Sequence, residues 1–348
     1  MQDFLNSTNF TQIFIALILI KFLLETYLKI RNLKSIDNNK ASVPPRFKDV
    51  VTDEEYKKSI LYNTDRIKFQ IFTALFGSVV LVIFTIGGLL NYLTEVVMDI
   101  TSSNVLGAVL LGLLLIIVEE IISIPISIYS TFVIEERHGF NKTTKKTFVT
   151  DIFKSLFISG AISSILYATV IFIIISAGDL WWIYAFAAVF TLQAIIFFLY
   201  PVLIMPLFNK FEPLDDEQFK KPIEKLLEKV DFKSKGLFVM NASLRSTHGN
   251  AFFTGFGKNK RIVFFDTLLK TINPDEMEAI LGHELGHYKL GHIRKTLISS
   301  LVFGFLGFYI LNEIFKSDNF FIAHGLENLT VYSKFLMFYL VICSYTFF

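Results

Sequence analysis

Two histidines and a glutamate within five residues, His283-Glu284-Leu-Gly-His287, form the stretch best suited to chemistry. On a helix, residues four apart lie one turn apart on one face, so both imidazoles can reach the same cation. Neutral imidazole suits Zn²⁺, which lowers the pKa of a bound water molecule. Glu284 lies one position round the helix, near that water without being a ligand. The pattern predicts one Zn²⁺ per chain on His283 and His287, with Glu284 as general base and then proton carrier to a leaving amine.

The residues before this motif predict the elements that position it. Asn273 can cap a helix, Pro274 suits its first position, and Glu276 suits the partner of a capping box. Earlier, two apolar segments flank a polar turn and predict a β-hairpin, at 250–256 and 261–265. A strand at 236–240 and helical spacing over 219–230 complete a predicted α/β metallopeptidase domain at 209–297. A chance match of five letters is the alternative, and the capped helix and the hairpin argue against it.

We expect different roles for two other histidines, His292 and His248. Metzincins place a glycine three residues, and a third histidine six residues, after the second histidine. Those positions hold Leu290 and Ile293 here, so that pattern fails. His292 comes five residues after His287, round the helix from the metal face, and we expect it to be structural or to support a ligand. His248 stands just before the hairpin, a position suited to contact with substrate.

The composition of the whole chain indicates more apolar surface than a soluble protein can bury. Hydrophobic residues make up 53% of the 348 residues, charged residues only 18%, and mean hydropathy is +0.54. A soluble globular protein has about 25% charged residues, so the excess apolar surface predicts a lipid bilayer as partner. The same numbers exclude a disordered chain. A net charge of +2 gives no case for nucleic acid, and the single Cys343 excludes a disulfide framework.

Seven apolar runs are long enough, or nearly so, to cross a bilayer. The last run is incomplete, because the sequence stops while still apolar. They predict a multi-pass α-helical membrane protein of about seven spans: 10–28, 69–92, 105–134, 152–177, 181–208, 298–315 and 331–348.

The polar segments between these runs predict the topology. Lys and Arg number nine, four and fifteen in the segments 31–68, 135–151 and 209–295. The alternate segments carry none, none and two, at 93–104, 178–180 and 316–334. The positive-inside rule places the three basic segments, and with them the catalytic domain, on the cytoplasmic face. The predicted organisation is five spans with two cytoplasmic loops in 1–208, the peptidase domain in 209–297, and the sixth and seventh spans in 298–348.

Charges inside the predicted spans need either water or a partner. Lys21 and Glu25 are four residues apart, so local pairing and a wet interior remain equal alternatives for them. Glu119 and Glu120 cannot pair with each other, which favours a wet interior; Lys154 is a fifth such charge.

Five blocks of the sequence resemble the type-1 CAAX prenyl proteases, which are sterile-24-like integral membrane zinc metallopeptidases. The similarity runs from about residue 60 to the end, in the same order. The blocks are Glu135-Glu-Arg-His-Gly-Phe-Asn-Lys, Tyr200-Pro-Val-Leu-Ile-Met-Pro-Leu-Phe-Asn-Lys-Phe, Arg245-Ser-Thr-His-Gly-Asn-Ala-Phe, Gly255-Phe-Gly-Lys-Asn-Lys-Arg-Ile-Val-Phe-Phe-Asp and His283-Glu-Leu-Gly-His-Tyr-Lys.

The resemblance implies seven helices around a water-filled chamber, closed by an α/β metalloprotease domain. In eukaryotic members it implies cleavage of prenylated proteins near their carboxyl terminus, in the endoplasmic reticulum membrane; a bacterial member would lie in the plasma membrane. It implies zinc on His283 and His287, with Glu284 as the base. Residues 250–252 (Asn250, Ala251 and Phe252) would form an edge strand that pairs with the substrate backbone, and His248 would lie beside the cleavage site. Gly249 and Phe252 stand where members usually show serine and tyrosine.

One departure from the family concerns the third zinc ligand. In the family it is a glutamate about ninety residues past the motif, whereas this sequence ends sixty-one residues past His287. The only later carboxylate side chains, Glu313, Asp318 and Glu327, do not match the family motif. We therefore expect the third ligand to lie beyond residue 348. The alternative is that an earlier glutamate approaches the metal, namely Glu119, Glu120, Glu135 or Glu136.

Three functions remain to be compared. The first is a zinc endopeptidase that acts on membrane-associated or lipidated proteins. The second is a non-catalytic membrane chamber used for binding or for membrane-protein quality control, which the missing ligand keeps open. The third is a transporter, supported only by the intramembrane charges. The motif and its capped helix favour the first.

Overall fold

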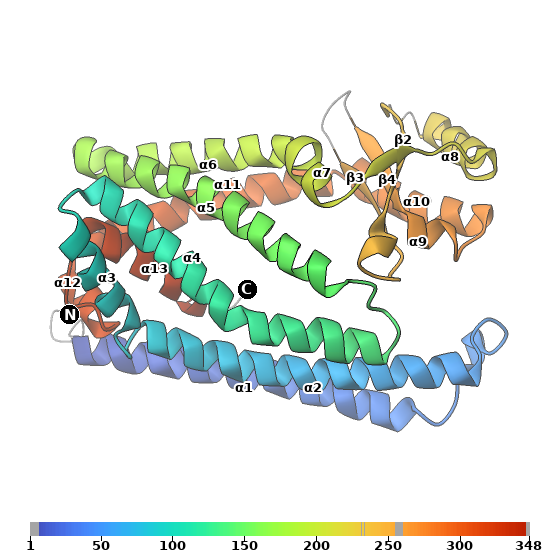
Figure 1. The fold of residues 1–348 in the computed structure, drawn as a ribbon, viewed down its shortest axis with the longest axis horizontal. Coiled ribbons are helices and arrows are strands. Elements are labelled where there is room, and N and C mark those ends of the chain that lie inside the picture. The colour runs from blue at the N-terminus through green and yellow to red at the C-terminus, as the bar shows by residue number, and fades with distance from the viewer. Residues whose placement is uncertain (1–6, 231, 233, 255–259, 346–348) are drawn as a thin grey trace. The chain divides into compact units, whose positions relative to one another are not determined.

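The computed structural model describes residues 7–230, 232, 234–254 and 260–345, and the chain divides into two compact units. Unit 1 comprises Met1–Ile134, Ser159–Ala185 and Phe308–Phe348, and unit 2 comprises Glu135–Ile158 and Phe186–Gly307. Helices make up unit 1, whereas unit 2 carries a small sheet as well (Figure 1). Each unit is a region of dense internal packing.

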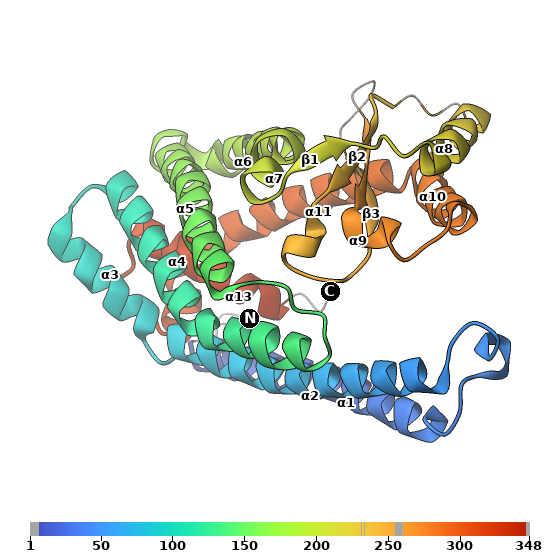
Figure 2. The ribbon, with the colours of Figure 1, turned by 45° about the vertical axis from the view of Figure 1, so that its right-hand side comes forward.

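Unit 1 contains the following helices, some of which continue into unit 2: α1 (Ser7–Asn39), α2 (Asp53–Phe84), α3 (Leu89–Ile100), α4 (Asn104–Tyr129), α5 (Lys145–Ser176), α6 (Trp181–Leu199), α11 (His292–Phe315), α12 (Asp318–Ala323) and α13 (Val331–Tyr345). The helices α1 and α2 lie side by side (Figure 1 and Figure 2). Short turns of 3₁₀-helix lie at Pro45–Phe47 and Gly178–Leu180, and a π-helical turn follows α4 at Ser130–Glu135.

Five helical segments of the described chain are long and apolar enough to cross a membrane: Asp53–Phe84, Asn104–Glu135, Lys145–Ser176, Gly178–Phe208 and His292–Phe315. They overlap with the second to sixth predicted runs. The helix α1 covers the first predicted run but is not among the five, and α13 contributes a shorter apolar helix at Val331–Ile342. Five of the seven predicted spans are therefore confirmed as membrane-capable helices.

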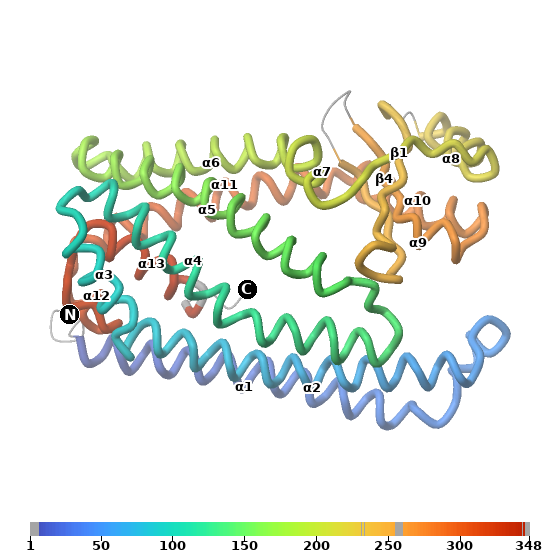
Figure 3. The backbone as a smooth tube through the Cα atoms, in the orientation of Figure 1, coloured from blue at the N-terminus to red at the C-terminus, as the bar shows by residue number. Residues whose placement is uncertain are grey.

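The second predicted span was wrong in its end, since the run 69–92 is not one helix. α2 stops at Phe84, and α3 starts at Leu89 after a turn in which Gly88 adopts a φ of 79°, a conformation that glycine takes without strain (Figure 3). Asn91 lies in the first turn of α3, and its Oδ1 accepts hydrogen bonds from the backbone N–H groups of Glu327 and Asn328, both at 2.9 Å. The segment 93–104, predicted to be a loop, is consequently helical up to Ile100.

Two of the charges inside the predicted spans have polar partners. Glu25 pairs along α1 with Lys29, one turn later, at 3.4 Å between Lys29 Nζ and Glu25 Oε2. Lys154 Nζ donates to the Leu207 carbonyl at 2.7 Å and lies 5.7 Å from the ring centre of Phe208. Glu25 thus has a partner on its own helix, although the partner weighed from the sequence was Lys21, and Lys154 has a partner 53 residues away.

Unit 2 holds a four-stranded sheet in the order β1-β2-β4-β3, made of β1 (Phe211–Pro213), β2 (Leu237–Met240), β3 (Ala251–Thr254) and β4 (Arg261–Phe265). β2 and β4 are parallel, and β1 and β3 run antiparallel to their neighbours. The predicted hairpin is confirmed by the β3–β4 pairing, with Phe252 opposite Val263; turn residues 257–259 lie outside the described residues. β3 is therefore an edge strand of this sheet.

Two helices cover one face of the sheet and bury the main core of unit 2, as Figure 2 shows. They are α8 (Glu217–Lys229) and α10 (Pro274–Lys289); α7 (Met205–Phe208) and α9 (Asp266–Leu269) are short. Strand alternation sends Ile262 and Phe264 into this core and Val263 to the opposite face. The buried core residues are Leu214, Phe219, Ile223, Leu227, Phe232, Leu237, Ala251, Ile262, Phe264, Leu268, Met277, Leu281 and Leu285.

Candidate metal centre and edge strand

The helix α10 is positioned by its cap and by one apolar face. Asn273 Oδ1 accepts from Glu276 N–H at 3.0 Å, and Glu276 Oε2 accepts from Asn273 N–H at 2.9 Å, so the predicted capping box is confirmed. The buried side chains of Met277, Leu281 and Leu285 recur every four residues and pack on the sheet. That spacing turns His283 and His287 to the opposite, exposed face.

The two histidines of the motif point at each other. His283 Nε2 and His287 Nε2 are 3.2 Å apart, and the ring centres are 4.8 Å apart. Two nitrogen ligands of a tetrahedral zinc ion stand about 3.3 Å apart, because each Zn–N bond is about 2.0–2.1 Å long. The pair therefore fits two corners of a zinc site. Glu284 is half-buried beside them, on the side of α10 nearer the core.

A third protein ligand is not found among the residues that the structure describes, where no cluster of three or more His, Cys, Asp or Glu could hold a metal. Glu135 and Glu136, which sequence reasoning offered as alternatives, have other partners. Glu135 Oε2 lies 3.1 Å from His248 Nε2, and Glu136 Oε2 accepts from Asn141 Nδ2 at 2.8 Å.

His292 lies beside His287, a contact that was not expected if one helix continued through both residues. α10 ends at Lys289, Gly291 adopts a φ of 67°, and His292 is the first residue of α11. The turn brings His292 Nδ1 to 2.7 Å from His287 Nδ1. Whether His292 is structural or supports a ligand stays a prediction. Its expected placement round the helix from His287 was wrong, because α10 ends before His292.

The edge strand offers backbone groups on its open side. Phe265 N–H donates to the Asn250 carbonyl at 2.9 Å, so by antiparallel alternation the N–H groups of Ala251 and Phe253 point away from β4. Asn250 Oδ1 accepts the N–H of Ala251 at 2.9 Å. The side chain of Phe252 packs with Val263 on the sheet face opposite α10.

His248 is held in place by residues far away in the sequence. Glu135 pairs with its Nε2, and the Phe140 ring stacks on the imidazole with 4.4 Å between ring centres and 19° between planes. Thr267 Oγ1 donates to the His248 carbonyl at 2.8 Å. The exposed ring is therefore fixed just before β3.

Arg245 is a residue that sequence reasoning did not single out as functional. Its guanidinium forms a two-point ion pair with Asp151, at 2.8 and 3.0 Å, and donates to Asn209 Oδ1 at 2.9 Å. Its carbonyl accepts from Lys142 N–H at 3.0 Å. These contacts tie the segment 135–151 to the sheet and so support Glu135 and Phe140 beside His248. The only sequence signal was that Arg245 opens one of the blocks shared with the family.

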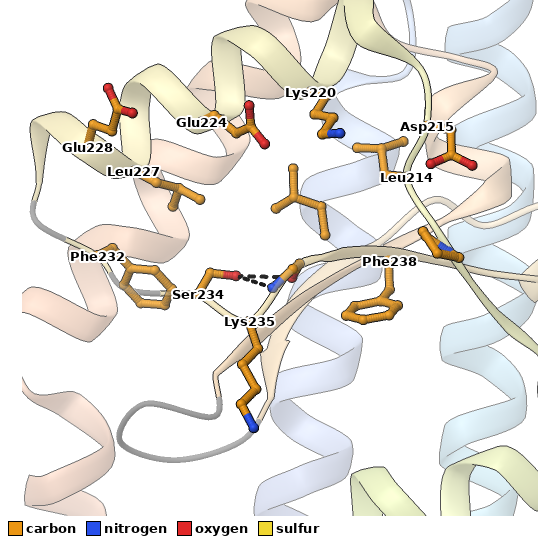
Figure 4. A pocket seen from close by; sticks show the side chains of 13 residues that line it. Leu214, Asp215, Lys220, Glu224, Leu227, Glu228, Phe232, Ser234, Lys235 and Phe238 are labelled. Atoms are coloured by element: carbon orange, nitrogen blue, oxygen red, sulfur yellow. Dashed lines mark hydrogen bonds between the residues drawn. The ribbon is translucent and has the colours of Figure 1, made fainter.

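Two pockets of unit 2 differ in character. A largely apolar pocket of about 740 Å³ is lined by β3, the end of α10 and the end of α6, with Phe253, Tyr288 and Phe197 among its walls. A more polar pocket of about 890 Å³ lies between α8 and β2, where Glu224, Lys220 and Lys235 are drawn in Figure 4. Of these two pockets, only the first borders both the edge strand and the helix that carries His283 and His287.

The fold and the site define a membrane-embedded metallopeptidase. Residues 32–210 match the model of the CAAX prenyl protease N-terminal region with five membrane helices, and residues 213–346 match the model of peptidase family M48. The chain therefore belongs to the CAAX prenyl proteases of peptidase family M48.

The relatives agree with this assignment over nearly the whole chain. The CAAX prenyl protease 1 homolog of Arabidopsis thaliana is 35% identical over 330 residues, which cover 91% of this chain and 76% of the relative. The CAAX prenyl protease 1 of Saccharomyces cerevisiae is 36% identical over 319 residues, covering 88% and 69%. The crystal structure of S. mikatae Ste24p superposes with a TM-score of 0.87 at 31% identity, covering 96% of this chain and 81% of that one.

Proposed function

We propose that this protein is a zinc endopeptidase that cleaves prenylated or otherwise lipidated proteins near their carboxyl terminus. The observation that carries the proposal is the pair of converging imidazoles, with Nε2 atoms 3.2 Å apart, beside Glu284. His283 and His287 would hold the metal. When bound, zinc supplies Lewis acidity that activates water and polarises the scissile carbonyl.

Glu284 is the proton carrier in this proposal. It stands one residue from a ligand and half-buried, so it is close to the reacting water without taking a corner of the metal site. It accepts a proton from the water as the carbonyl is attacked and then donates it to the leaving amine. Both transfers use the same carboxylate, which is neutral only between them.

The open side of β3 binds the substrate backbone. Ala251 and Phe253 present outward-pointing backbone groups that an extended peptide can pair with regardless of its sequence. Asn250 must release the Ala251 N–H before the substrate carbonyl can take its place. The fixed ring of His248 borders the amino-terminal end of this strand, which supports a contact with the peptide beside the cleaved bond.

The apolar pocket at the other end of β3 supports a lipidated substrate. Its walls include Phe197, Phe253 and Tyr288, and hydrocarbon gains about 25 cal/mol for each Å² that it removes from water there. The relatives from Arabidopsis thaliana and Saccharomyces cerevisiae are CAAX prenyl proteases, which supports a prenylated substrate. A substrate held by its lipid would present the nearby peptide bond to the edge strand.

The membrane orientation is part of the same proposal. The basic segments 31–68, 135–151 and 209–295 would face the cytoplasm, in the endoplasmic reticulum of a eukaryote or the plasma membrane of a bacterium. A cysteine introduced by Lys142→Cys, in a background without Cys343, should resist an impermeant thiol reagent added to intact cells. Labelling from outside would reverse the topology.

The catalytic assignment is tested with Glu284→Gln in the full-length protein. We expect unchanged zinc content and a loss of peptide cleavage of about 10²–10⁴-fold. Glu278→Gln, an exposed carboxylate on the same helix, is the matched control and should keep full activity. Activity of Glu284→Gln within about tenfold of wild type would contradict the general-base role.

The substrate class is tested separately, with one peptide synthesised with and without a prenyl group on its cysteine. We expect the prenylated form to have the higher kcat/KM, mainly through a lower KM. Equal values for both peptides would limit the proposal to a membrane peptidase without lipid recognition.

A further inference from the structure

His292 occupies a place from which it can control a metal ligand without touching the metal. It starts α11, whereas His287 lies in the last turn of α10, and the left-handed residue Gly291 lets the chain reverse between them. The two rings meet edge to face, with centres 4.9 Å apart and planes at 65°. Their Nδ1 atoms are 2.7 Å apart, a distance that requires a hydrogen bond.

One proton must lie between these two nitrogen atoms, because a neutral imidazole donates from one nitrogen and accepts at the other. If His287 Nε2 ligates a metal, its only proton is on Nδ1, and His287 is then the donor. His292 must accept at Nδ1 and carry its own proton on Nε2. In that arrangement the Nε2 of His287 is bare and turned toward His283, and an acceptor at His292 stabilises this tautomer.

We propose that His292 is a positioning residue of the metal centre, which fixes the tautomer and ring orientation of His287 from the first turn of a membrane-capable helix. The proposal rests on the zinc site proposed above. Hydrogen-bonded partners behind metal-ligating histidines typically change metal affinity by about 10–100-fold when they are removed. The same contact joins α11 to the metal centre, so a shift of α11 at this turn would be felt by His287.

A structural role for His292 makes different predictions. If His292 only packs its ring against His287, any ring of similar size should preserve zinc binding. If it acts as an acceptor, a ring without a nitrogen should fail, and a smaller side chain with an acceptor oxygen should partly succeed. The variants His292→Phe and His292→Asn separate these two roles.

The experiment measures the zinc dissociation constant of the full-length protein in detergent, by competition with a chromophoric chelator. We expect His292→Ala and His292→Phe to weaken zinc binding by about 10–100-fold and His292→Asn to recover part of the loss. Lys295→Ala, an exposed residue of the same turn of α11, is the control and should bind zinc like wild type. Cobalt in place of zinc should show an altered visible absorption spectrum in the Ala and Phe variants.

The outcomes distinguish this inference from the proposed function. Wild-type zinc affinity and cobalt spectrum in His292→Phe would overturn the positioning role while leaving the zinc site intact. Absence of zinc binding in the wild type would instead overturn the proposed function. If His292→Ala does not fold, the comparison of Phe with Asn decides, and melting of the chelator-treated proteins shows whether a loss of affinity is only a loss of folding.

Discussion

Acid should destabilise unit 1 through one buried histidine, His324. It follows α12 and is fully buried, with its ring 4.5 Å from that of Phe14 and 4.3 Å from that of Phe320, measured between centres. Its Nδ1 donates to the Phe320 carbonyl at 2.6 Å. Burial lowers the pKa of His324 from 6.5 to about 4, and the hydrogen bond to the carbonyl opposes the shift only in part.

The sign and size of the effect follow from this lowered pKa. Above pH 6.5 both the folded and the unfolded chain hold a neutral imidazole, so the histidine adds no pH dependence. Between pH 6.5 and about 4 the unfolded chain binds a proton at this histidine and the folded chain does not. The free energy of unfolding therefore decreases as the pH is lowered through this range. At about 1.4 kcal/mol per unit, the full loss is about 3 kcal/mol.

The assay compares wild type with His324→Gln, which keeps a donor for the Phe320 carbonyl but does not titrate. Unfolding in detergent is followed at several pH values between about 8 and 4.5, and the difference between the two proteins cancels other titrating groups. We expect the difference to move in favour of the variant by about 2–3 kcal/mol over this range. A difference that stays constant would refute the burial argument.

Three further predictions concern unit 2. Arg245→Lys removes the two-point geometry of the Asp151 pair. Because the two side chains are only 26% and 23% exposed, we expect a loss of about 1–2 kcal/mol and faster limited proteolysis of the segment 135–151. Gly291→Ala meets no atom within 4 Å of the new Cβ, so its cost of about 1–2 kcal/mol comes only from the φ of 67°, and Gly291→Asn should melt closer to wild type. The side chain of Leu281 is only 1% exposed, so Leu281→Ala leaves a cavity in the core of unit 2. The free energy of unfolding should fall by about 2–5 kcal/mol, as measured by thermal melting of the metal-free protein.

Local patterns predicted much of this protein because they depend on neighbours in the sequence. The Asn273 cap, the four-residue spacing of the histidines and the strand pair around the polar turn each involve contacts within a few residues. Long apolar runs likewise predicted five membrane-capable helices. The local patterns did not predict two contacts of the site. One lies across the turn between two helices, and the other joins residues far apart in the sequence.

The sequence by itself determined that His283 and His287 share one face of a capped helix, because helical geometry follows from spacing and capping chemistry. Only the tertiary structure decided which side chains stand behind that face. His292 meets His287 because Gly291 ends the helix in a left-handed turn, and a continuous helix would have kept the two rings apart. Glu135 meets His248 across 113 residues, a pairing set by the packing of whole segments through Arg245 and Asp151 rather than by any local preference.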